Sequence, residues 1–263
     1  LIKGNVKVYA STDPDAIPED VPVAMADISD LKMTIITNDP AKRYYYTLLF
    51  GDKYRVKIAT RNVNIPGIQN FRDLGGYPSY STKKQVRWGM IYRSAEIDSL
   101  ECYSRRELRN LGIKTLIDLR VSSETGRQSP LQKEFNVVHI PLATGDMENI
   151  LKGIREEKIK SDTVYRMVEQ MNRDLIDKYT TEYRQIFDIL LDKNSYPVVI
   201  HCSSGKGRTG IVSALVLAAL GINEDIIMED YRLSNDYFNI PSASKDAYQL
   251  PARSQEAITT LFS

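Results

Sequence analysis

The sequence predicts an α/β protein in which a mostly parallel sheet is flanked by helices and follows a small antiparallel β module. From about residue 86 onward, short β-branched runs alternate with helical stretches, a pattern typical of parallel sheets. The run at residues 113–119 reads as a buried parallel strand with polar residues at its end. Residues 1–61 instead carry strand-like runs and a hairpin signal, so we assign residues 62–263 to a separate, larger domain.

The first module is expected to be antiparallel because turn signals separate its strand-like runs. Residues 44–50 and 54–60 flank Gly51-Asp52, and apolar and basic side chains alternate in the second run, which indicates a hairpin. Residues 5–11 and 33–37 are further strand candidates, and a continuous helix between them is excluded by Pro14, Pro18 and Pro22. No cluster of reactive side chains lies here, so we expect a packing or docking module.

The larger domain opens with a loop-like segment and then alternates strands with helices. A helix at residues 103–111 is expected because Gly112 stands where a helix commonly ends. The other expected elements are strands at residues 86–92, 113–119, 136–140 and 197–201, and helices at residues 209–220 and 223–237. An insertion at residues 146–192 has apolar positions at helical spacing. It either covers the functional site or packs on the sheet.

Charge and hydropathy exclude several kinds of partner. Lys and Arg number 35 against 34 Asp and Glu, so no basic excess points to nucleic acid or a membrane surface. The longest apolar run, residues 211–222, is well short of the roughly 20 residues that a transmembrane helix needs. The sequence begins at Leu1 rather than Met, as a removed signal peptide or simple trimming would leave it. We expect a secreted or periplasmic protein in preference to a cytoplasmic one.

Cysteine and histidine are too sparse to predict a metal centre. Cys102 and Cys202 lie far apart in the sequence and share no metal-ligand spacing with His139 or His201. We therefore expect neither a metal nor a cofactor. A disulfide between the two cysteines would block Cys202, so a nucleophilic Cys202 must stay reduced.

Residues 198–210 carry the chemistry. A β-branched run delivers Cys202 into a glycine-containing turn, Arg208 closes the turn, and an apolar helix follows at once. Backbone N–H groups of such a turn, together with the positive end of the helix dipole, form a site for a phosphate-sized dianion. The same field favours the thiolate form of Cys202, which is the form that attacks.

These residue types permit phosphoryl transfer without a metal. Cys202 can attack phosphorus in line, Arg208 can hold two phosphoryl oxygens, and the Thr209 hydroxyl can stabilise the thiolate when it departs. The remaining oxygens are expected to be held by the backbone amides of Ser203, Ser204, Gly205, Lys206, Gly207 and Arg208. Water then hydrolyses the phosphocysteine.

With these residues the chain resembles the cysteine-dependent tyrosine and dual-specificity phosphatases, whose signature is Cys-x5-Arg. Residues 70–77 (Asn-Phe-Arg-Asp-Leu-Gly-Gly-Tyr), 92–94 (Tyr-Arg-Ser) and 117–120 (Ile-Asp-Leu-Arg), with Glu124, are similar to segments of the bacterial atypical tyrosine phosphatases. The resemblance covers about residues 64–240. It implies a cysteine-dependent phosphatase fold and activity on phosphotyrosine, other phosphorylated residues or phosphoinositides.

One residue of the turn departs from that subfamily. Gly207 stands where its members usually have aspartate, and the string Gly-Lys-Gly-Arg-Thr-Gly instead resembles the cradle of the phosphatase and tensin homologue, a phosphoinositide 3-phosphatase. Lys206 would add a positive charge beside the phosphate. Phosphorylated proteins, phosphoinositides and inositol phosphates are therefore all candidate substrates.

The loss of that aspartate leaves the proton donor for the leaving group open. Asp118 follows a buried strand at the ligand-binding edge of the sheet, and Asp146 lies where related phosphatases carry an acid loop; we favour Asp146 slightly. The alternatives are an ion pair of Asp118 with Arg93 or Arg120, and a solvated loop charge for Asp146.

Two roles remain open for the adjacent charges Arg72 and Asp73. They either brace the turn as a buried pair, which we favour, or contact the substrate. For the chain as a whole, the alternative to an active enzyme is a weak or inactive phosphatase-like module that binds phosphorylated ligands. Retention of both Cys202 and Arg208 favours the enzyme.

Overall fold

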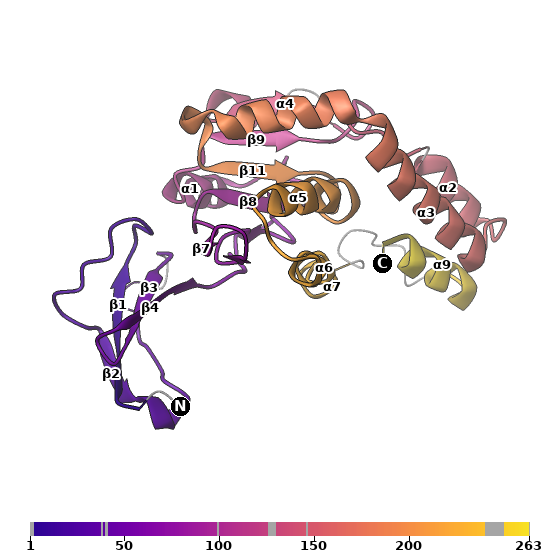
Figure 1. Cartoon of the computed structure of the whole chain (residues 1–263). Coiled ribbons are helices and arrows are strands. Elements are labelled where there is room, and N and C mark those ends of the chain that lie inside the picture. Colours follow the sequence, from indigo (N-terminus) through magenta and orange to yellow (C-terminus); the bar gives the residue numbers. More distant parts are fainter. Residues whose placement is uncertain are drawn as a thin grey trace.

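The computed structural model describes residues 3–37, 39, 42–98, 100–125, 130–145, 147–239 and 250–262. Its N-terminal part is a four-stranded antiparallel sheet in the order β2-β1-β3-β4, standing to one side of the larger domain (Figure 1). The strands are β1 (Asn5–Ser11), β2 (Ala24–Asp27), β3 (Tyr45–Phe50) and β4 (Tyr54–Ala59). The expected hairpin is confirmed as β3 and β4, with Phe50 paired to Tyr54.

The strand expected at residues 33–37 is wrong. That segment has no regular secondary structure, and β1 pairs instead with β2, where Val8 lies opposite Ala24, and with β3. A run of apolar residues forms a strand only where a neighbouring strand accepts its backbone hydrogen bonds, and the pattern of side chains alone does not identify that neighbour.

The larger domain is built on a five-stranded sheet in the order β10-β9-β11-β8-β5. The first four strands are parallel, and only the short β5 runs antiparallel to its neighbour β8. The expected mostly parallel sheet is therefore confirmed. Its strands are β5 (Arg72–Asp73), β8 (Ile91–Ser94), β9 (Thr115–Asp118), β10 (Asn136–His139) and β11 (Val198–His201).

The strand expected at residues 86–92 lies later, at Ile91–Ser94. Val86 is engaged elsewhere, because its backbone exchanges hydrogen bonds with Gly76 and Tyr77 in the preceding loop. The small ribbon of β6 (Pro78–Ser79) and β7 (Lys84–Gln85) forms in the same region.

Hydrophobic clusters cover both faces of the central strand. Val198 and Ile200 of β11 belong to one cluster and Val199 to another, as the alternation of side chains along a strand requires. The helices α4 (Thr180–Leu191) and α5 (Gly207–Ala219) cover the first face through Ile186 and Val212, whereas α1 (Cys102–Asn110) covers the second. The functional turn thus leaves a strand that is buried from both sides.

The insertion is helical, and its helices pack in two different places. Its helix α4 packs on the sheet, and α2 (Met147–Arg155) and α3 (Ser161–Lys178) form a separate apolar cluster with the C-terminal α9 (Ala252–Phe262). These three helices lie together beyond one end of the sheet (Figure 1). After α5 the chain continues through α6 (Glu224–Arg232) and α7 (Ser234–Tyr237).

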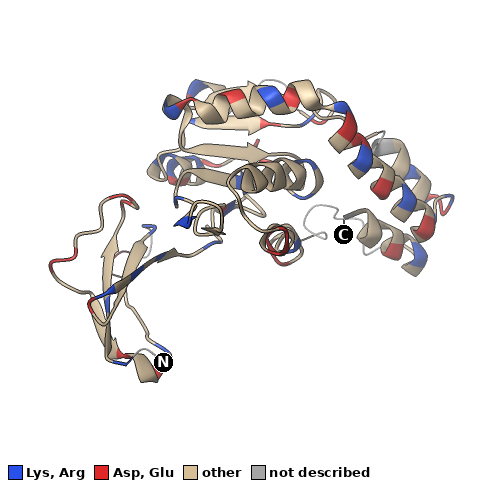
Figure 2. Cartoon of the chain, viewed as in Figure 1, with Lys and Arg blue, Asp and Glu red and all other residues tan. Residues whose placement is uncertain are grey.

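Positive and negative side chains are mixed on the helices, as the near-neutral composition predicts. Lys and Arg are interspersed with Asp and Glu along α3 and α4 (Figure 2), in keeping with the formal charge of +1. In the part of the chain that is described, no helix combines the length and the hydropathy required to cross a bilayer.

Candidate active site

The candidate nucleophile Cys202 follows the last residue of β11 and is almost completely buried, with 1% of its surface exposed. Its Sγ accepts a hydrogen bond from the Gly205 amide at 3.3 Å. Gly205 has φ +69°, and a Cβ at this position would lie 2.5 Å from the Ser94 carbonyl. Glycine is therefore required at this point of the turn, because it alone permits both the conformation and the close approach.

Three carbonyl groups of the turn accept hydrogen bonds from residues outside it. The Ser203 carbonyl accepts from the Glu96 amide at 3.2 Å, and the Ser204 carbonyl accepts from Asn70 Nδ2 at 3.1 Å. The Gly205 carbonyl accepts from Arg93 Nη2 at 2.8 Å. Because these carbonyls are engaged elsewhere, the amides of the turn are the backbone groups that an anion can use. The first N–H groups of α5, which starts at Gly207, have no partner within their own helix and extend this site.

Arg208 is held by Glu124 through two short contacts. Its Nη1 lies 2.5 Å from Glu124 Oε2 and its Nη2 lies 2.6 Å from Oε1. Ser203 also donates to Glu124, at 2.7 Å. Burial raises the pKa of Glu124, but hydrogen bonds and the charge of Arg208 outweigh it and hold the pKa below its usual value. A charged Glu124 thus fixes the plane of the guanidinium beside the turn.

Glu124 was not among the site residues expected from the sequence. Its position shortly after the Ile-Asp-Leu-Arg segment was the sequence signal for it. No local pattern shows that the loop after β9 reaches Arg208, so the contact could not be predicted.

Arg72 and Asp73 are fully buried and do not pair with each other. Arg72 donates to the Asp230 carbonyl at 2.9 Å and to Ser234 Oγ at 3.0 Å, whereas Asp73 pairs with Arg43 at 2.8 Å. Neighbouring residues of a strand point to opposite faces, which separates them. Neither side chain is accessible to a substrate in this structure, which supports the favoured bracing role, although the two residues brace through different partners and not as one buried pair.

The bracing reaches the turn through a second arginine. Asp230 Oδ2 lies 2.6 Å from Arg93 Nη1, and Arg93 in turn holds the Gly205 carbonyl. Burial lowers the pKa of Arg72 to about 10, and the neighbouring charge of Arg93 adds to this effect. Two buried arginines therefore share one carboxylate behind the turn.

Asp118 forms the ion pair that was the alternative to its acid role. Its carboxylate accepts from the Arg120 amide at 3.0 Å, from Arg120 Nε at 2.9 Å and from Arg120 Nη2 at 2.7 Å. Burial raises the pKa of Asp118, but the bonds from Arg120 outweigh it and the pKa lies below its usual value. This disfavours Asp118 as a proton donor. Asp146, the other candidate, lies outside the described residues.

Lys206 and Gly207 lie within the turn, and Thr209 follows Arg208 at the start of α5. Thr209 is fully buried, and its Oγ1 has no hydrogen-bond partner in the described part of the chain. Lys206 Nζ donates to Asn235 Oδ1 at 2.7 Å, and burial lowers the pKa of Lys206 to about 8. A Cβ at Gly207 would meet no atom within 4 Å, so a side chain is tolerated there.

His201 precedes the nucleophile but is not suited to carry protons. It is 2% exposed, and its Nδ1 makes no hydrogen bond to any described residue. Burial lowers the pKa of His201 to about 4, so the imidazole is neutral at physiological pH. The sequence offered no metal-ligand spacing, and no group of three potential metal ligands occurs in the described ranges.

A small cavity of about 80 Å³ lies over Cys202 and Arg208. Residues of the helical insertion form one wall, with α9 contributing Leu261; from α3 these are Val168, Met171, Asn172 and Leu175. Pockets for drug-sized ligands are several times larger, about 300–1,000 Å³. In this state the site admits little more than a phosphate group, and the insertion covers it.

Comparisons with known proteins agree on one family. A model of the tyrosine phosphatase family matches residues 63–263. The triple specificity protein phosphatase PtpB of Mycobacterium tuberculosis is 32% identical over 220 residues, which is 75% of each chain. A tyrosine-protein phosphatase of Nostoc commune is 26% identical over 148 residues, 55% of this chain and 48% of the relative.

A solved structure, P. aeruginosa TpbA in complex with pTyr, aligns with 65% of this chain and 86% of that one, at 16% identity and a TM-score of 0.32. We base the assignment on the sequence matches. Because the family model matches three quarters of this chain and a relative is 32% identical to it, the chain belongs to the tyrosine phosphatase family.

Proposed function

We propose that this protein hydrolyses phosphomonoesters through a phosphocysteine intermediate, with phosphotyrosine as a substrate. The observation that carries the proposal is the pairing of a buried Cys202 with an oriented Arg208, in a turn where three carbonyl groups accept hydrogen bonds from outside the turn. The groups that stabilise negative charge in the transition state are thus already in position before substrate binds, which is the main requirement of phosphoryl transfer.

Each step can be assigned to residues of the turn. The Cys202 thiolate attacks phosphorus, an S–P bond forms, and the ester P–O bond breaks as the leaving oxygen takes a proton. Arg208 and the turn amides hold the equatorial oxygens while charge spreads over them. Water then attacks phosphorus, which releases inorganic phosphate and restores the thiolate. The unpartnered Thr209 hydroxyl is available to donate a hydrogen bond to that thiolate.

For the proton donor we favour Asp146 over Asp118. Thr144, two residues before Asp146, lines the cavity over Cys202, whereas the Asp118 carboxylate is engaged by Arg120. The pH dependence of kcat/KM for Asp118→Asn and Asp146→Asn distinguishes them, because removal of the acid abolishes the basic limb of the profile. Retention of that limb in both variants would exclude both residues.

The substrate class extends beyond phosphotyrosine in this proposal. A relative over three quarters of the chain is named a triple specificity phosphatase, which supports activity on phosphoserine and phosphothreonine as well. Phosphoinositides are proposed on the charge of Lys206 beside the turn and on the space at Gly207. A second cation suits a head group that carries several phosphates.

The small volume of the cavity over Cys202 also supports a second candidate, a phosphatase-like module that binds phosphorylated ligands without turnover. A panel of phosphotyrosine and phosphoserine peptides, phosphoinositides and inositol hexakisphosphate, assayed for phosphate release, separates the two. We expect release that is abolished by Cys202→Ser and by Arg208→Ala.

The matched control is Cys102→Ser, because Cys102 is an exposed free thiol on α1. It should retain the wild-type rate. Turnover that persists in Cys202→Ser would exclude the nucleophile. Saturable binding without any phosphate release would establish the binding module instead.

A further inference from the structure

The N-terminal β module contributes an arginine to the interior of the phosphatase domain. Arg43 lies two residues before the start of β3 and outside residues 63–263, which match the family. Its guanidinium is 8% exposed and forms an ion pair with Asp73 of β5 at 2.8 Å. The family domain of this chain therefore contains a carboxylate whose countercharge comes from a different module.

Asp73 depends on that countercharge. Its side chain is 0% exposed, and it accepts hydrogen bonds from the Gly75 and Gly89 amides, each at 2.7 Å. Among the residues that the structure describes, the cation paired with it is Arg43. A fully buried carboxylate that loses its cation leaves an uncompensated charge, which the surrounding structure relieves by moving or by taking up a proton.

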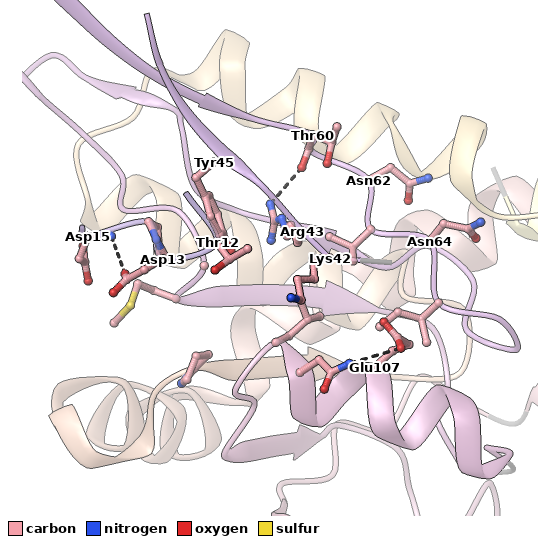
Figure 3. Close-up of a pocket in the computed structure, with 18 residues that line it drawn as sticks. Thr12, Asp13, Asp15, Lys42, Arg43, Tyr45, Thr60, Asn62, Asn64 and Glu107 are labelled. Carbon is pink, nitrogen blue, oxygen red and sulfur yellow. Dashed lines mark hydrogen bonds between the residues drawn. The ribbon is translucent and has the colours of Figure 1, made fainter. Parts of the chain in front are cut away.

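Arg43 is held in a defined position. It donates to Tyr92 Oη at 2.8 Å and to the Thr60 carbonyl at 3.0 Å, and its guanidinium lies 4.8 Å from the centre of the Tyr45 ring. Figure 3 shows Arg43 beside Tyr45 and Thr60 on the wall of a cavity of about 750 Å³ between the module and the domain. Its partners thus come from both units.

The strand that carries Asp73 also carries the brace of the active site. Asp73 and Arg72 are the two residues of β5, which pair with Tyr92 and Arg93 of β8. Arg72 binds Asp230, Asp230 binds Arg93, and Arg93 holds the Gly205 carbonyl of the turn. Direct contacts therefore connect β5 to the peptide that closes the turn around Cys202.

We propose that Arg43 is a positioning residue for catalysis, and that the N-terminal module is an integral part of the phosphatase rather than an independent docking unit. Arg43 acts by neutralising Asp73 and holding β5 in register with β8. It touches neither substrate nor Cys202. This proposal rests on the proposed function for its kinetic readout and has a second readout that does not.

The test compares three substitutions in the full chain. Arg43→Met removes the charge, Arg43→Lys retains it, and Arg87→Met is the matched control. Arg87 forms an ion pair with Asp15 of the N-terminal module, and both side chains are more than half exposed. Loss of an exposed pair has little effect, whereas loss of a buried one has a large effect.

For Arg43→Met we expect kcat to fall at least about fivefold, the lower end of typical coupling between sites, with KM changed much less. Arg43→Lys should recover most of kcat, and Arg87→Met should match the wild type. Hydrogen–deuterium exchange of the peptide spanning residues 198–210 should rise in Arg43→Met alone. All assays are done below the thermal transition of each variant, so that only folded protein is compared.

An Arg43→Met variant with wild-type kcat and wild-type exchange in residues 198–210 would overturn the proposal. So would a loss of activity shared equally by Arg87→Met, because that would indicate a general weakening of the interface. If the wild type showed no turnover, the exchange measurement would still decide whether Arg43 orders the turn, and only the proposed function would fail.

Discussion

The sharpest prediction concerns Gly205, because the structure provides both a reason and a control. A Cβ at Gly205 would lie 2.5 Å from the Ser94 carbonyl and 2.6 Å from the Ala95 amide, about 0.9 Å short of ordinary contact. These are backbone atoms and cannot rotate away. The left-handed conformation adds about 1–2 kcal/mol for any residue with a side chain. Gly205→Ala must therefore displace the turn by close to 1 Å.

A displacement of this size in an active site reduces the rate by about a hundredfold. We expect that loss in kcat/KM for an aryl phosphate, together with weaker binding of inorganic phosphate measured by calorimetry. Gly207→Ala is the control within the same turn, since a Cβ there meets no atom within 4 Å, and its loss should be much smaller. A Gly205→Ala enzyme within threefold of the wild type would refute the reasoning.

Three further predictions follow from the charges around the turn. Burial lowers the pKa of Lys206 to about 8, so KM should rise as the pH passes through 8, and Lys206→Arg, which stays charged, should remove this rise. Glu124→Gln should reduce kcat/KM about ten- to hundredfold, the factor that corresponds to the loss of a charged hydrogen bond to Arg208. An unchanged kcat/KM would contradict the role of Glu124 in orienting Arg208. Although burial raises the pKa of Asp118, the hydrogen bonds from Arg120 outweigh it and lower this pKa below 3.8 in the folded protein. The ionised carboxylate therefore stabilises the fold above pH 3.8, and this stabilisation is lost on acidification. The free energy of unfolding of Asp118→Asn should be lower than that of the wild type at pH 7, and the difference should shrink at low pH.

The sequence predicted the strand, turn and helix at residues 198–210 because these parts are contiguous. A buried strand, a cysteine, a glycine-containing turn and an apolar helix follow one another within residues 198–210, so local chain geometry sets their arrangement. The alternation of strands and helices likewise predicted the parallel sheet. Errors arose where the outcome depended on a distant partner, as at residues 33–37, which have no neighbouring strand.

The sequence by itself thus indicated the candidate nucleophile Cys202, the candidate cation Arg208 and the family's class of chemistry. Only the tertiary structure showed that Glu124 orients Arg208, that Arg72 and Asp73 serve different partners, and that Arg43 reaches a buried carboxylate. The physical reason is that a buried charge must find its countercharge in space. Residues far apart in the chain supply it, and no local pattern records which ones they are.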